Sequence, residues 1–296
     1  MKTIYLDTCV WNALAKLTLP DGAIEQTPAS EIVISRHVVY ELAKTHEKDP
    51  EFAFQLFKTA TRLFDSGAKI INEPFNILIE EMKLIRDGQA IDFLFPNRRD
   101  FRAEMVRLQD GTTDQVTEFI ASKLRDAETD KNRIAENLSV MSEERQFLSE
   151  LPESSLNDWI TKELLNLGSL RRLLEKLVAL FPEEPTPDLL EWAQVLLRSP
   201  ECKVTQGLLR TDLYYNWRCA KTDRNVAAKD LLPDTYHVIN ALYCSAYVTS
   251  ESKQRKYLEL LGLKSNQFYI WDGVERIDRW LKSVSDRLEI DGSRNA

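Results

Sequence analysis

Four carboxylates stand where predicted strands end or predicted helices begin. Asp7 closes the first apolar strand, and Glu41 lies one turn into the helix that follows the second strand. Asp234 starts a helix near the end of the chain, and Glu251 follows the strand after that helix. In a parallel sheet with right-handed crossovers, the carboxyl ends of strands and the N-termini of helices share one edge. We therefore expect these four side chains to converge despite their wide separation in the sequence.

A cluster of carboxylates is electrostatically unfavourable unless cations lie among them. Oxygen-only ligand sets suit Mg²⁺ or Mn²⁺, and two such ions roughly 3.5–4 Å apart can activate a water and stabilise the leaving oxygen in phosphodiester cleavage. The pattern therefore predicts a divalent-metal site with Mg²⁺ or Mn²⁺ as cofactor. Each acid also has a purely structural explanation, because Asp7 and Asp234 suit helix N-termini and Glu41 and Glu251 suit a solvated surface.

The first 72 residues predict three short strands separated by helices. Apolar β-branched runs indicate buried parallel strands, Ser35 suits the N-cap of a helix, and Gly67 ends another. We expect strands over 4–6, 31–35 and 68–72, and helices over 11–17, 37–46 and 51–66.

The pattern changes to long, charged helices between residues 73 and 203 and then returns to alternating helices and strands. Strands are expected over 246–249 and 267–271, with helices over 235–244, 253–261 and 273–288. The whole predicts an α/β fold of three layers, α/β/α, with a central mostly parallel sheet. Residues 1–72 and 204–296 form this discontinuous domain, and residues 73–203 form an all-α insertion.

The amino-acid composition favours a globular protein over a membrane or secreted protein. The 296-residue chain is 43% hydrophobic and 29% charged, which is typical of a globular domain with room for an insertion. It has no apolar run of about 18 residues and no signal-peptide core, so we expect a cytoplasmic protein without membrane contact. The net charge of −8 argues against coating nucleic acid through bulk charge, but a nuclease needs only a local basic rim. The 4 cysteines lack CxxC spacing and are expected as free buried thiols.

Three segments of the chain resemble the PIN-domain ribonucleases. They read IYLDT at the start, VISRHVVYEL in the second segment, and LPDTYHVINALYCSAYVTSESK near the end. The last segment is the most specific, because its D-x-x-H is followed by a short strand that ends in Thr and an acid. The resemblance covers roughly the first 70 and the last 90 residues and leaves out the middle.

The resemblance implies a PIN-like fold in which Asp7, Glu41, Asp234 and Glu251 are both catalytic residues and metal ligands. It implies metal-dependent endonucleolytic hydrolysis of RNA, with DNA left open, often by a toxin or an antiviral defence effector. The implied partners are an inhibitor protein or a component of a defence system, and a homo-oligomer stays open. The chain departs from the family pattern at Cys9, where many members have Asn, and at Glu251, where Asp is usual.

Substrate contacts are expected from residues that precede or follow Asp234. His237 lies three positions after it, beside the expected site. Arg218, Lys221 and Arg224 are interleaved with Tyr214, Tyr215 and Trp217, and basic and aromatic side chains together suit single-stranded RNA. An equally acceptable interpretation is a helix with core aromatics and solvated charges. His37 shares a face with Glu41 and is expected at the surface.

Two functions from different classes fit these observations. The first is the metal-dependent endoribonuclease. The second is a catalytically inactive PIN-like binding module whose helical insertion docks a protein or nucleic-acid partner. A phosphatase with a second Asp two residues after Asp7 is set aside, because Cys9 occupies that position.

Overall fold

The computed structural model describes residues 2–17, 27–95, 98–110, 114, 116–118, 121–122, 142–221, 235–252 and 255–294. Asp234 and Arg224 lie outside these residues. None of the described helices is long and apolar enough to span a membrane.

A sheet of five parallel strands forms the centre of the fold. The strands are β1 (Ile4–Leu6), β2 (Ile32–Ile34), β3 (Lys69–Ile70), β4 (Ala246–Thr249) and β5 (Phe268–Ile270). Their spatial order is β3-β2-β1-β4-β5, and every neighbouring pair is parallel. The expected α/β class and all five strands are confirmed, each within two residues of the predicted ends.

The strand order places β1 between segments that are far apart in the chain. Ile4 pairs with Ile32 on one side and with Ala246 on the other. The order of strands reverses at β1, and ligands of open α/β sheets bind outside the carboxyl ends of strands at such a point. Asp7, directly after β1, therefore occupies the position where this fold class places its ligand.

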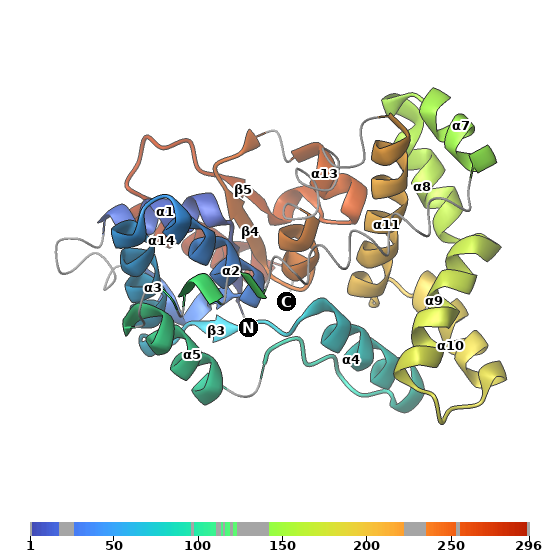
Figure 1. Ribbon diagram of the computed structural model, residues 1–296, viewed down its shortest axis with the longest axis horizontal. Helices are drawn as coiled ribbons and strands as arrows, with labels where there is room; N and C mark the ends of the chain where they lie inside the picture. The colour runs from blue at the N-terminus through green and yellow to red at the C-terminus, as the bar shows by residue number, and fades with distance from the viewer. Residues whose placement is uncertain are drawn as a thin grey trace.

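Helices cover both faces of the sheet (Figure 1). The ribbon shows α1 (Thr8–Leu17), α3 (Pro50–Asp65) and α14 (Ile277–Arg294) on one side of β4 and β5, with α13 (Arg255–Leu261) on the other. The strands β1, β2 and β4 are fully buried, which explains why they read as continuous apolar runs. The arrangement agrees with three α/β/α layers.

Local sequence signals fix the helix that carries Glu41 and the turn that leads to β3. The Ser35 hydroxyl caps α2 (Arg36–Lys44) by accepting a hydrogen bond from Val38 N at 3.1 Å. Helix α3 ends before Gly67, whose φ of +113° is a conformation that glycine adopts without strain. The predicted cap and the predicted stop are both confirmed.

The remaining helices belong mainly to the region predicted as an insertion. They are α4 (Pro74–Asp87), α5 (Arg98–Asp110), α7 (Ser142–Glu150), α8 (Leu156–Leu164), α9 (Leu167–Leu180), α10 (Thr186–Arg198) and α11 (Lys203–Lys221). Residues 235–241 are also helical. Short 3₁₀ turns occur at Ala29–Glu31, Thr45–Glu47, Glu153–Ser155 and Ser265–Gln267.

These helices contact the α/β part through α5, which packs against α3, and through α11, which packs against α13. Among themselves, α7 and α8 pack against α11, and α10 packs against α9 and α4. An isolated antiparallel bridge also joins Ile71 to Leu94. One apolar core runs from the sheet into α9 and α10, so the helical region is continuous in packing with the α/β part. The predicted domain boundaries stay a prediction.

The aromatic residues of α11 lie in a second apolar cluster. Tyr214, Tyr215 and Trp217 are 3%, 5% and 4% exposed and pack with residues of α7 and α8. Rings buried in this way do not present a face for base stacking, which favours the core interpretation of this helix. All four cysteines are free, as expected, and three of them are buried.

A buried carboxylate connects α4 to the start of α11. Glu81 is 0% exposed, and its Oε1 accepts hydrogen bonds from Val204 N at 2.7 Å and from the Tyr243 hydroxyl at 2.5 Å. Its Oε2 accepts from Thr205 N at 2.8 Å and from the Thr205 hydroxyl at 2.5 Å. The first N–H groups of a helix lack partners within the helix, so Glu81 acts as the N-terminal cap of α11 from a distant segment.

Candidate metal and catalytic site

Asp7 is held between its own helix and the neighbouring strand. Its backbone N–H donates to Val248 O at 2.9 Å, which continues the pairing of β1 with β4. Its side chain is buried; Oδ1 accepts from Thr8 N at 2.7 Å, and Oδ2 accepts from the Thr249 hydroxyl at 2.6 Å. Helix α1 begins at Thr8, so Asp7 also complements the positive N-terminal end of this helix. The structural explanation for Asp7 therefore applies, and its role as a metal ligand stays a prediction.

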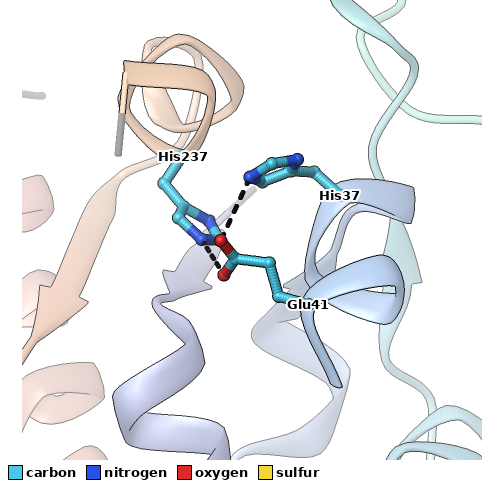
Figure 2. Close-up of side chains that lie close together, drawn as sticks. All are labelled: His37, Glu41 and His237. Atoms are coloured by element: carbon cyan, nitrogen blue, oxygen red, sulfur yellow. Dashed lines mark hydrogen bonds and ion pairs between the residues drawn. The ribbon is translucent and has the colours of Figure 1, made fainter. Parts of the chain in front are cut away.

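Glu41 lies between two histidines from different parts of the chain (Figure 2). Its Oε2 accepts a hydrogen bond from His237 Nε2 at 2.7 Å, and its Oε1 lies 3.6 Å from His37 Nε2. The Thr8 hydroxyl also donates to Oε2. His37 is one turn before Glu41 on α2, whereas His237 comes from the helical residues 235–241. The expected surface position of His37 is wrong in part, because its side chain is only 19% exposed and faces the site.

His237 connects the two predicted carboxylates and is itself fixed from behind. Its Nε2 lies 3.6 Å from Asp7 Oδ1 and 2.7 Å from Glu41 Oε2. Its Nδ1 lies 2.9 Å from the Tyr5 hydroxyl, which lies 2.7 Å from Ser35 Oγ. Burial raises the pKa of Tyr5 well above its usual value, with Glu41 and Asp7 contributing, so the phenol keeps its proton. Tyr5 and Ser35 therefore hold the imidazole with Nε2 towards the acids.

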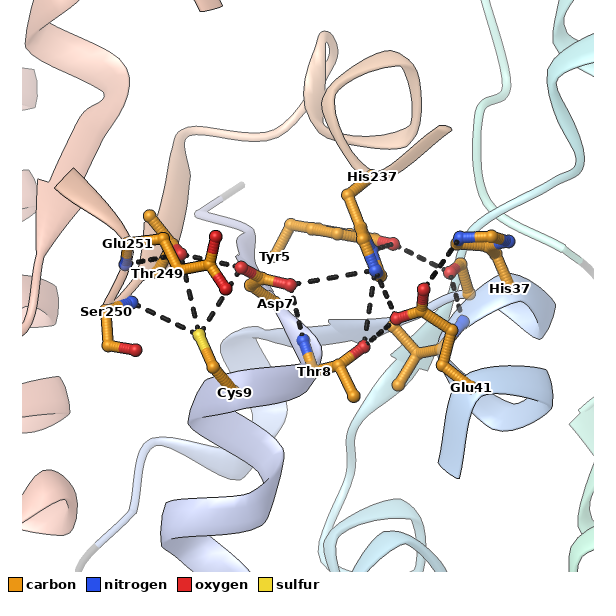
Figure 3. Close-up of polar contacts among 12 residues, drawn as sticks. Tyr5, Asp7, Thr8, Cys9, His37, Glu41, His237, Thr249, Ser250 and Glu251 are labelled. Carbon is orange, nitrogen blue, oxygen red and sulfur yellow. Dashed lines mark hydrogen bonds and ion pairs between the residues drawn. The ribbon is translucent and has the colours of Figure 1, made fainter. Parts of the chain in front are cut away.

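The other end of the site is formed by Cys9 and the residues after β4 (Figure 3). The Cys9 thiol donates to Asp7 Oδ2 at 3.3 Å and accepts from Ser250 N at 3.2 Å. Burial, with a contribution from the Asp7 charge, raises the pKa of Cys9 to about 11, so this residue is a protonated thiol at neutral pH. Glu251 is exposed, and its backbone N–H donates to the Thr249 hydroxyl at 3.0 Å. Thr249 thus links Glu251 to Asp7.

The charge state of Glu41 follows from opposing effects. Burial disfavours its ionised form, but the hydrogen bonds and positive charge of His237 and His37 outweigh this and hold the pKa of Glu41 well below its usual range. Metal-free protein is therefore expected to keep Glu41 ionised from pH 6 down to about pH 3, whereas a glutamate in the unfolded chain takes up a proton near pH 4.3. Below that pH the unfolded state binds a proton that the folded state does not, so the contribution of Glu41 to stability falls as the pH falls.

Carbon-13 NMR of the glutamate side-chain carboxyl groups tests this expectation, with the Glu41 signal assigned by its loss in Glu41→Gln. The signal should not move between pH 6 and pH 3 in folded protein. A titration of Glu41 with its midpoint between about pH 4 and 5 would contradict the expected charge state.

The structure brings together three of the predicted site residues. Asp7, Glu41 and His237 form one connected cluster, and Glu251 is joined to it through Thr249. Arg218 and Lys221 lie near the end of α11, which packs against α7, α8 and α13, and Lys221 Nζ lies 5.5 Å from the ring centre of Trp217. Asp234 and Arg224 lie outside the described residues, so their predicted roles stay predictions.

The hydroxyl groups that position the site could not be identified from the sequence. Tyr5 is in an apolar strand, Ser35 serves as a helix cap, and Thr8 and Thr249 follow or end strands. Each of these residue types is common at its position, so none of them indicated a functional site. Only Tyr5 gave a signal, because a tyrosine in a buried strand usually has a hydrogen-bond partner for its hydroxyl.

Comparison with known proteins found no relative whose site could be set beside this one. No protein-family model, no curated protein and no solved structure matches this chain.

Proposed function

We propose that this protein is a metal-dependent endoribonuclease with a PIN-like fold, which hydrolyses RNA phosphodiester bonds at the carboxyl edge of its sheet. The observation that carries the proposal is the meeting of Asp7 and Glu41 at the point where the strand order reverses. Asp7 follows β1 and Glu41 lies on α2, the helix after β2, and the two acids share one neighbour, His237 Nε2, at 3.6 Å and 2.7 Å.

The chemistry of these side chains fits a divalent cation. Asp7 and Glu41 supply carboxylate oxygens, and Glu41 is ionised through the usual pH range. Carboxylates are the ligands that Mg²⁺ and Mn²⁺ prefer. Asp7 and Glu41 would hold the ion, with Asp234 and Glu251 as the further predicted ligands. When bound, the ion supplies an activated water and stabilises charge on the phosphate and leaving oxygens.

The neighbouring hydroxyl and imidazole groups have positioning roles. Thr249 and the N–H of Thr8 fix both oxygens of Asp7, and His237 fixes Glu41. His237 is 1% exposed, so its burial disfavours the substrate contact expected from the sequence, and in the metal-free protein it orients Glu41. Such supporting residues typically change metal affinity or activity by about 10–100-fold.

The nature of the substrate rests on the resemblance of the three sequence segments to PIN-domain ribonucleases. The same resemblance carries the proposals of a cytoplasmic toxin or defence effector and of an inhibitor or defence-system partner. The alternative is a PIN-like module without catalysis that binds a partner through its helical region. That region, with α7, α8, α9 and α10, extends away from the sheet (Figure 1), which is the observation that favours this second candidate.

Removal of metal separates the two candidates. Protein freed of metal with EDTA is incubated with single-stranded RNA, structured RNA and single-stranded DNA, and Mg²⁺ or Mn²⁺ is then restored. We expect internal cleavage of RNA only after metal is restored, with a loss of at least about 100-fold in EDTA. Lack of cleavage under every condition, together with tight retention of intact RNA or a protein partner, would favour the binding module.

A further inference from the structure

We propose that His37, Glu41 and His237 form a binding site for one Zn²⁺-class transition-metal ion. The sequence predicted an all-carboxylate site, and neither imidazole belonged to it. In the structure one ligand atom from each of these three side chains lies within 4.8 Å of the other two. The inference concerns the metal alone and does not require that the protein cleave RNA.

The distances within the cluster suit a shared ion. His37 Nε2 lies 3.6 Å from Glu41 Oε1, and His237 Nε2 lies 2.7 Å from Glu41 Oε2. Zinc binds imidazole nitrogen and carboxylate oxygen at about 2.0–2.2 Å, so two ligand atoms on one ion lie at most about 4.4 Å apart. The three donors therefore need only small movements to meet one ion. The rings of His37 and His237 already lie edge to face, with centres 4.7 Å apart (Figure 2).

The types of donor decide the class of metal. Imidazole nitrogen favours zinc and its neighbours, whereas Mg²⁺ favours oxygen ligands and keeps several waters. Two histidines and one glutamate also form the three-ligand set of catalytic zinc sites, which leave a fourth position for water or substrate. The whole chain has only 3 histidines, and two of them lie against the same carboxylate.

The groups behind His237 allow its Nε2 to become a metal ligand while its Nδ1–H keeps a hydrogen-bond partner. In the metal-free state the positively charged imidazole donates Nε2–H to Glu41 and Nδ1–H to the Tyr5 oxygen, and the Tyr5 hydroxyl donates to Ser35 Oγ. When Nε2 binds an ion, its proton is released to solvent, and the hydrogen bonds from Nδ1–H and from Tyr5 are kept. The distances of 2.9 Å and 2.7 Å along this chain suit these hydrogen bonds. This is the supporting arrangement found behind metal-binding histidines.

Cobalt binding to the full chain tests the proposal, because Co²⁺ replaces Zn²⁺ and has visible absorption bands that report its ligands. Protein freed of metal is titrated with Co²⁺ and the complex is then challenged with Zn²⁺ or with millimolar Mg²⁺. We expect one Co²⁺ per chain, displaced by Zn²⁺ and not by Mg²⁺. His37→Ala and His237→Ala should each weaken binding at least about tenfold. His46→Phe is the matched control, because His46 is the remaining histidine and packs against Phe54; its affinity should be unchanged.

If His237→Ala does not fold, His37→Ala still tests the proposal, because the half-buried His37 side chain can be removed with less effect on the core. Equal Co²⁺ affinity in wild type and His37→Ala, or ready displacement by Mg²⁺, would overturn the proposal. RNA cleavage with Mg²⁺ in a protein that binds no Co²⁺ would reject this inference and leave the proposed nuclease intact. Co²⁺ binding that depends on His37, in a protein that cleaves no RNA, would support this inference and reject the nuclease.

Discussion

Asp7→Asn is expected to reduce RNA cleavage by at least about 100-fold while the protein stays folded. The asparagine retains one oxygen to accept from Thr8 N, and its amide N–H can donate to the Thr249 hydroxyl in place of the present bond at 2.6 Å. The hydrogen bonds with Thr8 and Thr249 therefore survive, whereas the Cys9 thiol loses its acceptor on this side chain and the negative charge that attracts the cation is lost. The initial rate of RNA cleavage at saturating Mn²⁺ is the measurement, with circular dichroism to confirm the fold.

Asp65→Asn is the matched control for this change. Asp65 is an exposed carboxylate at the end of α3, paired with Arg102 at 2.6 Å, and it lies before β3, near the amino edge of the sheet. Its cleavage rate should equal that of the wild type. A rate for Asp7→Asn equal to that of Asp65→Asn would remove Asp7 from the site and with it the proposed nuclease centre.

Glu81→Ala is expected to lower the free energy of unfolding by roughly 3 kcal/mol. The change leaves the N–H groups of Val204 and Thr205 and the hydroxyls of Thr205 and Tyr243 without their buried carboxylate partner. A buried donor that loses its partner costs about 1–3 kcal/mol, and the N-terminus of α11 also loses a negative charge. Urea denaturation followed by circular dichroism measures the loss.

Glu80→Ala separates this effect from a general loss of helix stability. Glu80 is the adjacent residue of α4 and forms an ion pair with Lys83 at 2.7 Å, with side chains 20% and 40% exposed. Exposed pairs of this kind contribute about 0–1 kcal/mol, so this variant should stay close to the wild type. Similar losses for the two variants would show that Glu81 does not act as the cap of α11.

Much of the fold could be predicted from the sequence because the signals are local. The apolar runs at Ile4–Leu6 and Ile32–Ile34 are continuous, so they indicated strands buried on both faces. Ser35 and Gly67 marked the start of α2 and the end of α3 through hydrogen bonding and backbone freedom. Such features depend on a few neighbouring residues and are independent of the rest of the chain.

The contacts of the site could be predicted only in part. Asp7 and Glu41 follow strands, so their edge of the sheet was predictable from the topology of parallel sheets. The position of His37 was not, since an amphipathic helix pattern shows which residues share a face but not what covers that face. The aromatics of α11 raised the same problem, because Tyr214 and Trp217 could equally bind RNA or fill a core until α7 and α8 were placed against them.

The sequence by itself determined the strands, the helices and the edge on which Asp7 and Glu41 lie. Only the tertiary structure decided that β1 lies between β2 and β4, and this order sets the partners of both acids. Pairing with β4 brings Thr249 to Asp7, and the packing around β1 brings His237 to Tyr5 and Glu41. A helix or strand pattern depends on residues that are close together in the chain, whereas contacts across some 200 residues arise only when the layers of the fold close together. The metal ligands proposed here, two imidazoles on one carboxylate, are a product of that closure.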